Sequence, residues 1–255
     1  MRLQEWWFWY DKIVKTLKLD REKDQESTFL LSKLIVGKAL TPNVLRAKIH
    51  GKNVLVFGAG PSLEEDLWNV IETGFYGKCT LVTADGATSA LLERGIVPHV
   101  VVTDLDGKIP DLVKAQKQGS VLVVHAHGDN IETLKRIVPK LNKILGTTQV
   151  KPVPRVYNFG GFTDGDRCVF LAENFDAKKI ILAGMDFGNM VGKYSKPNVG
   201  KDLEISPFKR KKLQIAKRLL EWLSSWAKVE ILNLTSHGEN IRGIKKVGYK
   251  QLVKL

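Results

Sequence analysis

The chain has 255 residues, 44% of them hydrophobic and 26% charged, and a formal net charge of +13. The length and composition are those of a soluble globular protein with one substantial core and room for a smaller appended domain. The only two cysteines, Cys79 and Cys168, exclude a disulfide framework, so we expect free thiols and a cytoplasmic protein.

The positive charge is concentrated in the last quarter of the chain. Residues 189–255 hold 15 Lys and Arg against 5 Asp and Glu, most densely at Lys209-Arg210-Lys211-Lys212. A basic face attracts nucleoside triphosphates, nucleic acid or an acidic membrane surface. A solvated lysine-rich surface is the alternative for most of the individual lysines.

Residues 1–50 predict an N-terminal helical segment, with a charged break at Asp20 to Glu26. The aromatic run Trp6-Trp7-Phe8-Trp9-Tyr10 is too short to cross a bilayer and lacks the layout of a signal peptide. It favours a core-facing helix or one that forms a homodimer, with contact at a membrane surface the lesser alternative.

From residue 53 the pattern alternates between apolar strands and amphipathic helices. This alternation predicts an α/β fold with a doubly wound, mostly parallel sheet and helices on both faces. We expect an α/β catalytic core over 51–190, then a loop (a lid is one use for it), a long helix and a strand over 191–255. The predicted strands are 53–57, 80–83, 100–103, 121–124, 144–145, 180–183 and 229–233; the predicted helices are 63–71, 88–94, 112–118, 131–138, 163–174 and 208–226.

Two strand ends carry aspartates, in Ala84-Asp85-Gly86-Ala87 and in Val102-Thr103-Asp104-Leu105-Asp106-Gly107. Open α/β sheets bind ligands at the carboxyl ends of their strands. If the segment is extended, Asp104 and Asp106 share a face about 6.5 Å apart, with Leu105 turned away. Such carboxylates repel each other unless a cation lies between them, and oxygen ligands favour Mg²⁺. The alternative is an Asx turn that merely ends the strand.

The first strand is followed by a glycine-rich turn, Gly58-Ala59-Gly60-Pro61-Ser62-Leu63-Glu64-Glu65. Its glycines let backbone amides approach a phosphate at the start of a helix, so Gly58, Gly60 and Ser62 are candidate phosphate ligands. Ser62 and Glu65 also have the spacing of a capping box. A plain strand-to-helix turn is the alternative, and a P-loop is excluded because no Lys-Ser/Thr follows.

A third strand end reads His125-Ala126-His127-Gly128-Asp129-Asn130. Two histidines sharing one face raise the possibility of zinc, but no further nitrogen or sulfur ligand is placed nearby. We favour Asp129 in a magnesium shell, with a histidine, His127, reaching phosphate.

A second glycine-rich loop, Asn158-Phe159-Gly160-Gly161-Phe162-Thr163-Asp164-Gly165-Asp166-Arg167, opens a predicted helix. In one interpretation Thr163 caps that helix, and the negative charges of Asp164 and Asp166 interact favourably with the positive N-terminal end of the helix dipole. In the other, backbone amides of the loop contact an anion or a planar ring between Phe159 and Phe162, and Arg167 grips a phosphate. Asn158, Gly161 and Phe162 are then candidate substrate-binding residues. Asp186, in Gly184-Met185-Asp186-Phe187-Gly188, adds a further strand-end aspartate.

These motifs resemble those of known pyrophosphokinases. Ala84 to Ala87, Gly95-Ile96-Val97-Pro98 and Thr103 to Gly107 resemble the motifs of thiamine pyrophosphokinases, although His99 and Gly107 stand where those enzymes usually have Asp and Ser. The complete set over residues 53–188 is similar to the archaeal 6-hydroxymethyl-7,8-dihydropterin pyrophosphokinase family. Bacterial flagellin-glycosylation accessory proteins share the same core.

The resemblance implies transfer of a diphosphate from ATP to the hydroxymethyl group of a pterin alcohol, with Mg²⁺ and with AMP as the second product. This places the enzyme in folate- or methanopterin-type pterin biosynthesis. By position, Asp104, Asp106 and Asp129 would hold Mg²⁺, and Asp85 would orient the alcohol or a metal-bound water. Asp164 would accept hydrogen bonds from the pterin ring, and lysines near 209–212 would meet the triphosphate.

Two other classes of function stay open. One is a metal-dependent sugar-nucleotide glycosyltransferase on the same core, which also uses paired aspartates. The other is a nucleotide- or nucleic-acid-binding module, suggested by the basic C-terminal quarter. Clustered acids at the sheet edge would repel a nucleic-acid backbone, so the partners we expect are small molecules, with neither nucleic acid nor membrane.

Overall fold

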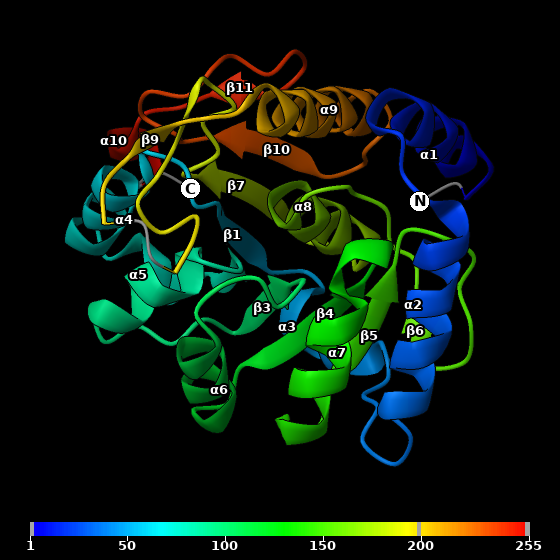
Figure 1. Cartoon of the computed structure of the whole chain (residues 1–255). Helices are drawn as coiled ribbons and strands as arrows, with labels where there is room; N and C mark the ends of the chain where they lie inside the picture. The colour runs from blue at the N-terminus through cyan, green and yellow to red at the C-terminus, as the bar shows by residue number, and fades with distance from the viewer. Residues whose placement is uncertain (1–2, 198–199, 253–255) are drawn as a thin grey trace.

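The protein is built on one large parallel sheet. The computed structural model describes residues 3–197 and 200–252, and its sheet has the strand order β11-β10-β7-β1-β2-β3-β4-β5-β6, every neighbouring pair parallel (Figure 1). The strands are β1 (Asn53–Phe57), β2 (Thr80–Ala84), β3 (Val100–Thr103), β4 (Val121–Ala126), β5 (Leu145–Thr148), β6 (Val156–Tyr157), β7 (Lys179–Ala183), β10 (Glu230–Asn233) and β11 (Lys245–Lys246).

The chain reverses its direction of travel across the sheet beside β1. Strands β2 to β6 extend the sheet on one side of β1, and β7, β10 and β11 extend it on the other. A reversal of this kind opens a crevice at the carboxyl ends of the strands, where ligands of doubly wound sheets bind. The predicted fold class is therefore confirmed.

Helices cover both faces because strand residues alternate between two apolar layers. In β1, Val54 and Val56 pack toward one layer, and Leu55 and Phe57 toward the opposite one. The first layer is covered by α1 (Leu3–Leu17), α3 (Asn43–Ile49), α8 (Asp164–Asn174) and α9 (Pro207–Ser224). The opposite face is covered by α4 (Leu63–Glu72), α5 (Ala87–Glu93), α2 (Arg21–Leu34), α6 (Ile109–Lys117) and α7 (Ile131–Ile137).

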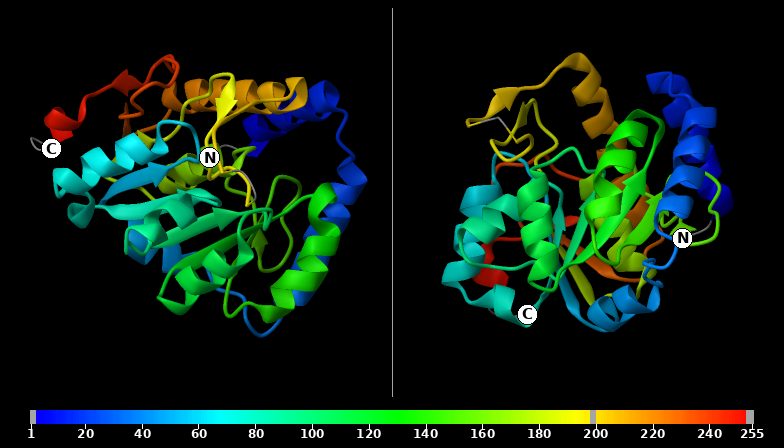
Figure 2. Two further views of the ribbon diagram at one scale, coloured as in Figure 1. Left: turned by 60° about the vertical axis from the view of Figure 1, so that its left-hand side comes forward. Right: turned by 60° about the horizontal axis from the view of Figure 1, so that its bottom comes forward.

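Most of the aromatic side chains near the N-terminus pack against other parts of the same chain. Trp6 is fully buried and its Nε1–H donates to the Gln149 carbonyl at 2.9 Å. Trp9 packs on Trp222 of α9, with ring centroids 5.8 Å apart, and α1 lies alongside α9 in Figures 1 and 2. Phe8 is 58% exposed. Core packing therefore accounts for most of the run, and the homodimer stays a prediction.

The predicted strands and helices of the core correspond to observed ones, with ends shifted by a few residues. Three short additions were not predicted: β6, β11 and the helix Tyr249–Leu252 (α10). The stretch predicted as a loop after residue 189 contains a small antiparallel pair, β8 (Met190–Val191) with β9 (Leu203–Glu204). No helix among the described residues has both the length and the apolar character needed to cross a bilayer.

Candidate active site

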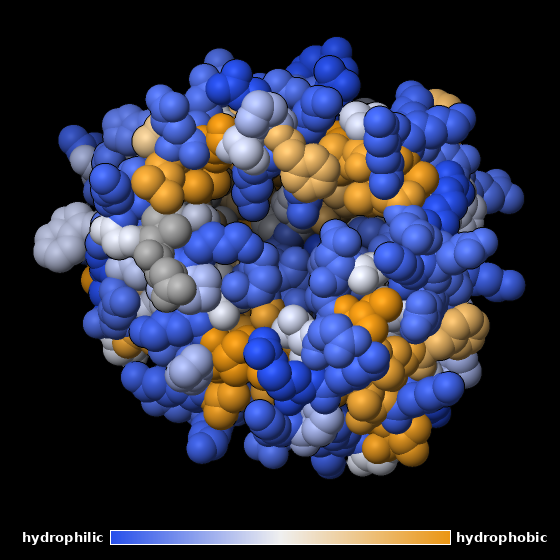
Figure 3. Space-filling model, in the orientation of Figure 1, coloured by the Kyte–Doolittle hydropathy of each residue, from blue (hydrophilic) through white to orange (hydrophobic). Residues whose placement is uncertain are grey.

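A large cavity lies at the carboxyl ends of the central strands. Its volume is about 390 Å³, and its walls come from the strand ends, the α1–α2 junction, the β8–β9 segment and the first turns of α8 and α9. In Figure 3 the hollow near the centre of this face is bordered mainly by hydrophilic residues. The sheet edge expected to carry the site therefore does form a cavity.

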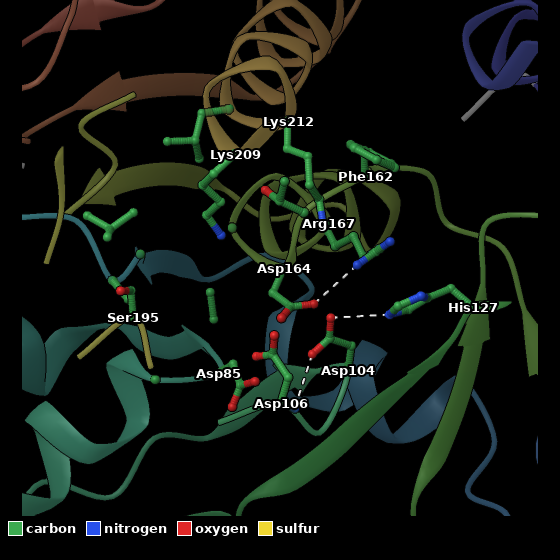
Figure 4. Close-up of a pocket in the computed structure, with 18 of the residues that line it drawn as sticks. Asp85, Asp104, Asp106, His127, Phe162, Asp164, Arg167, Ser195, Lys209 and Lys212 are labelled. Atoms are coloured by element: carbon green, nitrogen blue, oxygen red, sulfur yellow. Dashed lines mark hydrogen bonds and ion pairs between the residues drawn. The ribbon is translucent and has the colours of Figure 1, made fainter. Parts of the chain in front are cut away.

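Three aspartates at this edge form a compact acidic trio. Asp85 follows β2, Asp104 and Asp106 follow β3, and one carboxylate oxygen from each lies within 4.8 Å of the others (Figure 4). The Asp104–Asp106 segment is a turn and not an extended strand, because Leu105 has φ 67° and the Asp106 N–H donates to Asp104 Oδ1 at 3.2 Å. The Asx turn and the paired carboxylates, considered above as alternatives, thus occur together.

Asp85 is the member of the trio that most needs a cation. It is buried, and neither of its carboxylate oxygens has a hydrogen-bond partner among the described residues. Burial, followed by the charges of Asp164, Asp104 and Asp106, raises the pKa of Asp85 well above its usual range. An unpartnered buried carboxylate beside other carboxylates is costly, and a divalent cation would remove that cost. The donor set, all oxygen, fits Mg²⁺.

His127 contacts the trio from β4. The Asp129 N–H donates to His127 Nδ1 at 3.3 Å, which leaves Nε2–H to donate to Asp104 Oδ2, also at 3.3 Å. Burial acts to raise the pKa of Asp104, but the His127 hydrogen bond and the charges of Arg167 and Lys212 outweigh it and hold that pKa far below its usual range. Asp104 is therefore ionised and available to a metal.

Asp129 lies outside the acidic trio. Its side chain is 89% exposed, and its Oδ2 is 3.9 Å from His127 Nδ1. Of the three aspartates expected to hold Mg²⁺, Asp104 and Asp106 lie together with Asp85, and Asp129 is not in that cluster. His125, the other half of the zinc hypothesis, is buried, with Nδ1 3.2 Å from Thr147 Oγ1. The cluster that could hold a cation is thus made of carboxylates.

Asp164 and Arg167, both from the first turn of α8, complete the polar centre. Arg167 Nη1 donates to Asp164 Oδ1 at 3.2 Å, and Nη2 donates to Gln149 Oε1 at 3.0 Å. Arg167 Nε is buried with no hydrogen-bond partner among the described residues. Burial and then the charge of Asp104 raise the pKa of Asp164 to about 8. In Figure 4 Asp164 points toward Asp104 and Asp106.

Three lysines face the acidic centre. Lys209 and Lys212, one turn apart on α9, line the cavity, whereas Arg210 and Lys211 of the same basic run are exposed. Burial, and then the nearby Lys212 and Lys196, lower the pKa of Lys209. Lys196, from the β8–β9 segment, forms an ion pair with Asp106. Cations and carboxylates thus share one cavity, as a site for a metal–polyphosphate complex requires.

The glycine-rich turn after β1 lines the cavity, but its donors have partners inside the protein. The Gly58 N–H donates to the Ala183 carbonyl and the Gly60 N–H to the Gly184 carbonyl, both at 2.9 Å. Ser62 directs its N–H and its hydroxyl to Asp186, with Oγ 2.5 Å from Oδ1. The N–H groups of Gly58, Gly60 and Ser62 and the Ser62 hydroxyl, which were expected to bind phosphate, therefore already donate hydrogen bonds inside the protein.

The capping box predicted for Ser62 and Glu65 is wrong. Ser62 caps no backbone amide of α4: its hydroxyl donates to Asp186, which lies after β7, and accepts the His237 N–H at 3.1 Å. Glu65 pairs with His237 at 2.7 Å. The cap predicted at Thr163 is confirmed in outline: Asp166 at the third helical position accepts the backbone N–H groups of Phe162 and Thr163, both at 2.7 Å.

The second glycine-rich loop supplies support as well as lining. Phe162 lines the cavity, and the Lys212 ammonium lies 5.6 Å from its ring centre. Asn158 and Gly161 are not among the described residues that line the cavity. Asn158 bonds to the Val150 carbonyl, and Gly161 packs so closely on Arg167 that a Cβ there would lie 2.6 Å from the Arg167 Cα. These two residues are placed to shape the loop that leads into α8, the helix that carries Arg167.

Asp24, Gln149 and Lys196 are among the cavity-lining polar residues that sequence reasoning missed. Asp24 lies within a stretch that is charged at most of its positions, and Gln149 follows the short strand β5 without any motif. Lys196 lies in the segment that was predicted to be a loop, with a lid as one possible use, and it was not singled out there. No local pattern distinguished them from surface residues.

Comparison with known proteins gives consistent results. A family model described as 6-hydroxymethylpterin diphosphokinase MptE-like matches residues 32–192. Proteins named 6-hydroxymethyl-7,8-dihydropterin pyrophosphokinase are 42% identical in Methanocaldococcus jannaschii, 44% in Methanothermobacter thermautotrophicus and 46% in Pyrococcus furiosus. Each match covers 91–92% of this chain and 99–100% of the relative.

Among solved structures, a Maf glycosyltransferase from Magnetospirillum magneticum AMB-1 aligns with a TM-score of 0.45 and 13% identity, over 84% of this chain and 39% of that one.

The family model covers more than half of the chain, and the three relatives match almost end to end, which confirms the resemblance seen in the motifs. The chain belongs to the MptE-like family of 6-hydroxymethylpterin diphosphokinases.

Proposed function

We propose that the protein transfers the terminal diphosphate of ATP to the hydroxymethyl group of 6-hydroxymethyl-7,8-dihydropterin, in a reaction that requires Mg²⁺. The observation that carries this proposal is the acidic trio Asp85, Asp104 and Asp106 facing Arg167, Lys209 and Lys212 across one cavity. The names of the relatives supply the pterin substrate.

In this reaction the substrate hydroxyl oxygen attacks the β-phosphorus of ATP. The bond between that phosphorus and the α–β bridging oxygen breaks, and AMP leaves with the bridging oxygen. Catalysis of such a transfer depends on positioning and on neutralising charge more than on covalent chemistry. The residues of this cavity match those two needs.

The acidic trio is the site we assign to Mg²⁺, because it offers oxygen ligands and includes two buried carboxylate oxygens that have no hydrogen-bond partner within residues 3–197 and 200–252. When bound, the ion would neutralise charge on the phosphate oxygens. Arg167, whose Nε lacks a partner in the described part of the chain, and the two α9 lysines are the groups that would bind the remaining phosphate charge.

Asp164 is the carboxylate of the centre that stands outside the trio. We assign it to the substrate alcohol, where it would hold the hydroxyl and accept its proton as the new P–O bond forms. Its position beside Asp104 favours this role over the ring contact implied by the family resemblance. His127 holds Asp104 in place and borders the same polyphosphate region.

The test is a product assay. Purified protein, ATP, Mg²⁺ and 6-hydroxymethyl-7,8-dihydropterin are incubated, and the products are separated by anion-exchange chromatography and followed by phosphorus NMR. The proposal expects AMP and the pterin diphosphate in equal amounts, with no turnover in EDTA. ADP as the product would reject diphosphate transfer. In a separate incubation with nucleotide sugars in place of ATP and the pterin, release of UDP or CMP would indicate a glycosyltransferase.

A further inference from the structure

The N-terminal helices reach into the active site through one buried carboxylate. Residues 17–20 at the α1–α2 junction, together with Lys23 and Asp24 of α2, line the same cavity as the acidic trio. Asp24 is 3% exposed, which is rare for a carboxylate without a role in bonding. The hydrogen bonds that its carboxylate accepts therefore indicate its role.

Asp24 accepts hydrogen bonds from three separate parts of the chain. Oδ1 accepts the Gly128 N–H at 2.6 Å, and Oδ2 accepts the Tyr10 hydroxyl at 2.6 Å and Gln149 Nε2 at 2.7 Å. These are short, charge-assisted bonds. The contact at Gly128 is close enough that a Cβ there would lie 2.9 Å from the Lys23 Cβ and 3.3 Å from Asp24 Oδ1.

One of these bonds determines the orientation of Arg167. Because Gln149 Nε2 donates to Asp24, the amide oxygen of Gln149 is directed the other way, where it accepts Arg167 Nη2 at 3.0 Å. The guanidinium is thus held between Gln149 and Asp164, and its Nε has no partner among the described residues. Asp24 therefore orients Arg167 through a single intermediate side chain.

The Gly128 bond reaches the opposite side of the centre. Gly128 follows His127, whose Nε2–H donates to Asp104. Fixing the Gly128 amide fixes the backbone from which His127 extends. Both of the basic groups that contact the acidic centre from this side, His127 and Arg167, are thus connected to the same carboxylate.

We propose that Asp24 is a positioning residue for the reaction: it holds Arg167 and His127 in the orientation that receives the phosphates of ATP. This proposal rests on the proposed function for the identity of the ligand. A carboxylate is needed at residue 24 because two acceptor atoms serve three donors, whereas an asparagine would offer one oxygen and one amino group.

The decisive variant is Asp24→Asn, with Thr28→Val as the structural control. Thr28 lies one turn further along α2 and bonds to the Asp24 carbonyl and to Thr148 Oγ1, both away from the Asp24 carboxylate. Both variants remove buried hydrogen bonds of the same helix, so both should lower the melting temperature. Only Asp24→Asn should disturb Arg167 and His127.

The readouts are kcat, KM for each substrate, and the affinity for α,β-methylene ATP with Mg²⁺ by calorimetry. We expect Asp24→Asn to weaken nucleotide binding and kcat/KM for ATP by about 10- to 100-fold. KM for the pterin alcohol should change less than about twofold, and Thr28→Val should bind the nucleotide as the wild type does. The proposal would be overturned if Asp24→Asn lowered kcat/KM equally for ATP and for the pterin alcohol. It would also be overturned if Thr28→Val bound the nucleotide as weakly as Asp24→Asn does. Either result would mean that Asp24 has only a structural role.

A double variant tests the path through Gln149. In Asp24→Asn with Gln149→Glu, the new amide can donate to the new carboxylate, which can still accept Arg167, and the net charge is unchanged. Recovery of most of the nucleotide affinity supports the path, and no recovery contradicts it. If the wild type binds the nucleotide but makes no pterin diphosphate, the proposed function fails while this comparison still decides the role of Asp24.

Discussion

Gly107 lies directly against the carboxylate of Asp85. A Cβ placed on Gly107 would stand 2.0 Å from Asp85 Oδ1 and 2.6 Å from its Cγ. The absence of a side chain at residue 107 is what allows Asp85 to join Asp104 and Asp106. This contact gives a structural reason for the glycine that stands where thiamine pyrophosphokinases usually have serine.

Gly107→Ala should therefore displace Asp85 from the acidic trio. We expect metal affinity and kcat to fall by about 10- to 100-fold, the usual consequence of misplacing one ligand or its support. Manganese binding followed by electron paramagnetic resonance measures the first effect. Gly77→Ala is the matched control, since a Cβ there meets nothing within 4 Å. Normal manganese binding in Gly107→Ala would show that Asp85 is not a ligand.

Asp106→Asn should abolish most of the turnover with little loss of stability. Asp106 is half exposed and its replacement relieves repulsion within the trio, so the fold keeps its support while the cation loses a ligand. We expect a loss in kcat on the order of 100- to 1000-fold. Asp129→Asn should lose far less, because that carboxylate is 89% exposed and outside the trio. Equal losses in the two variants would return Asp129 to the metal shell.

Asp85→Asn should be more stable than the wild type in the absence of metal. The wild-type carboxylate is buried beside three others with its oxygens unpartnered, and an amide removes that repulsion. Millimolar Mg²⁺ should stabilise the folded wild type and so raise its melting temperature. At a Mg²⁺ concentration one hundred times the Kd, the free energy of unfolding should increase by about 2.7 kcal/mol. The variant should show much less of this increase in differential scanning calorimetry. An equal increase in both proteins would place the cation elsewhere.

Asp66 should make stability depend on pH. It is buried and accepts bonds from the Gly184 N–H and from Ser236, and burial raises its pKa from 3.8 to about 6. The folded protein thus keeps the proton to higher pH than the unfolded chain does. The stability linked to this proton is fully present below pH 3.8 and is lost as the pH rises through 6.

Urea unfolding of the wild type and Asp66→Asn at several pH values measures this effect. From pH 4 to 7 the wild type should lose about 2–3 kcal/mol more than the variant, which cannot titrate at this position. Parallel pH profiles for the two proteins would show that Asp66 has an ordinary pKa.

Much of the fold follows from local patterns. The runs Asn53 to Phe57 and Val121 to Val124 predict buried parallel strands because they are apolar over their length and are separated by amphipathic helices. The short strands β6 and β11 have two residues each, too few for any period to be recognised. Their existence depends on pairing with β5 and β10, the strands that precede them in the chain.

By itself the sequence determined that aspartates and glycines gather at one edge of a parallel sheet, because strand direction and strand ends are local properties. Only the tertiary structure decided which groups meet there: Asp85 and not Asp129 in the trio, Asp186 on the donors of Ser62, and Asp24 behind Arg167. The physical reason is that a polar group bonds to whichever partner packing brings within about 3 Å, and that partner can lie more than a hundred residues away along the chain.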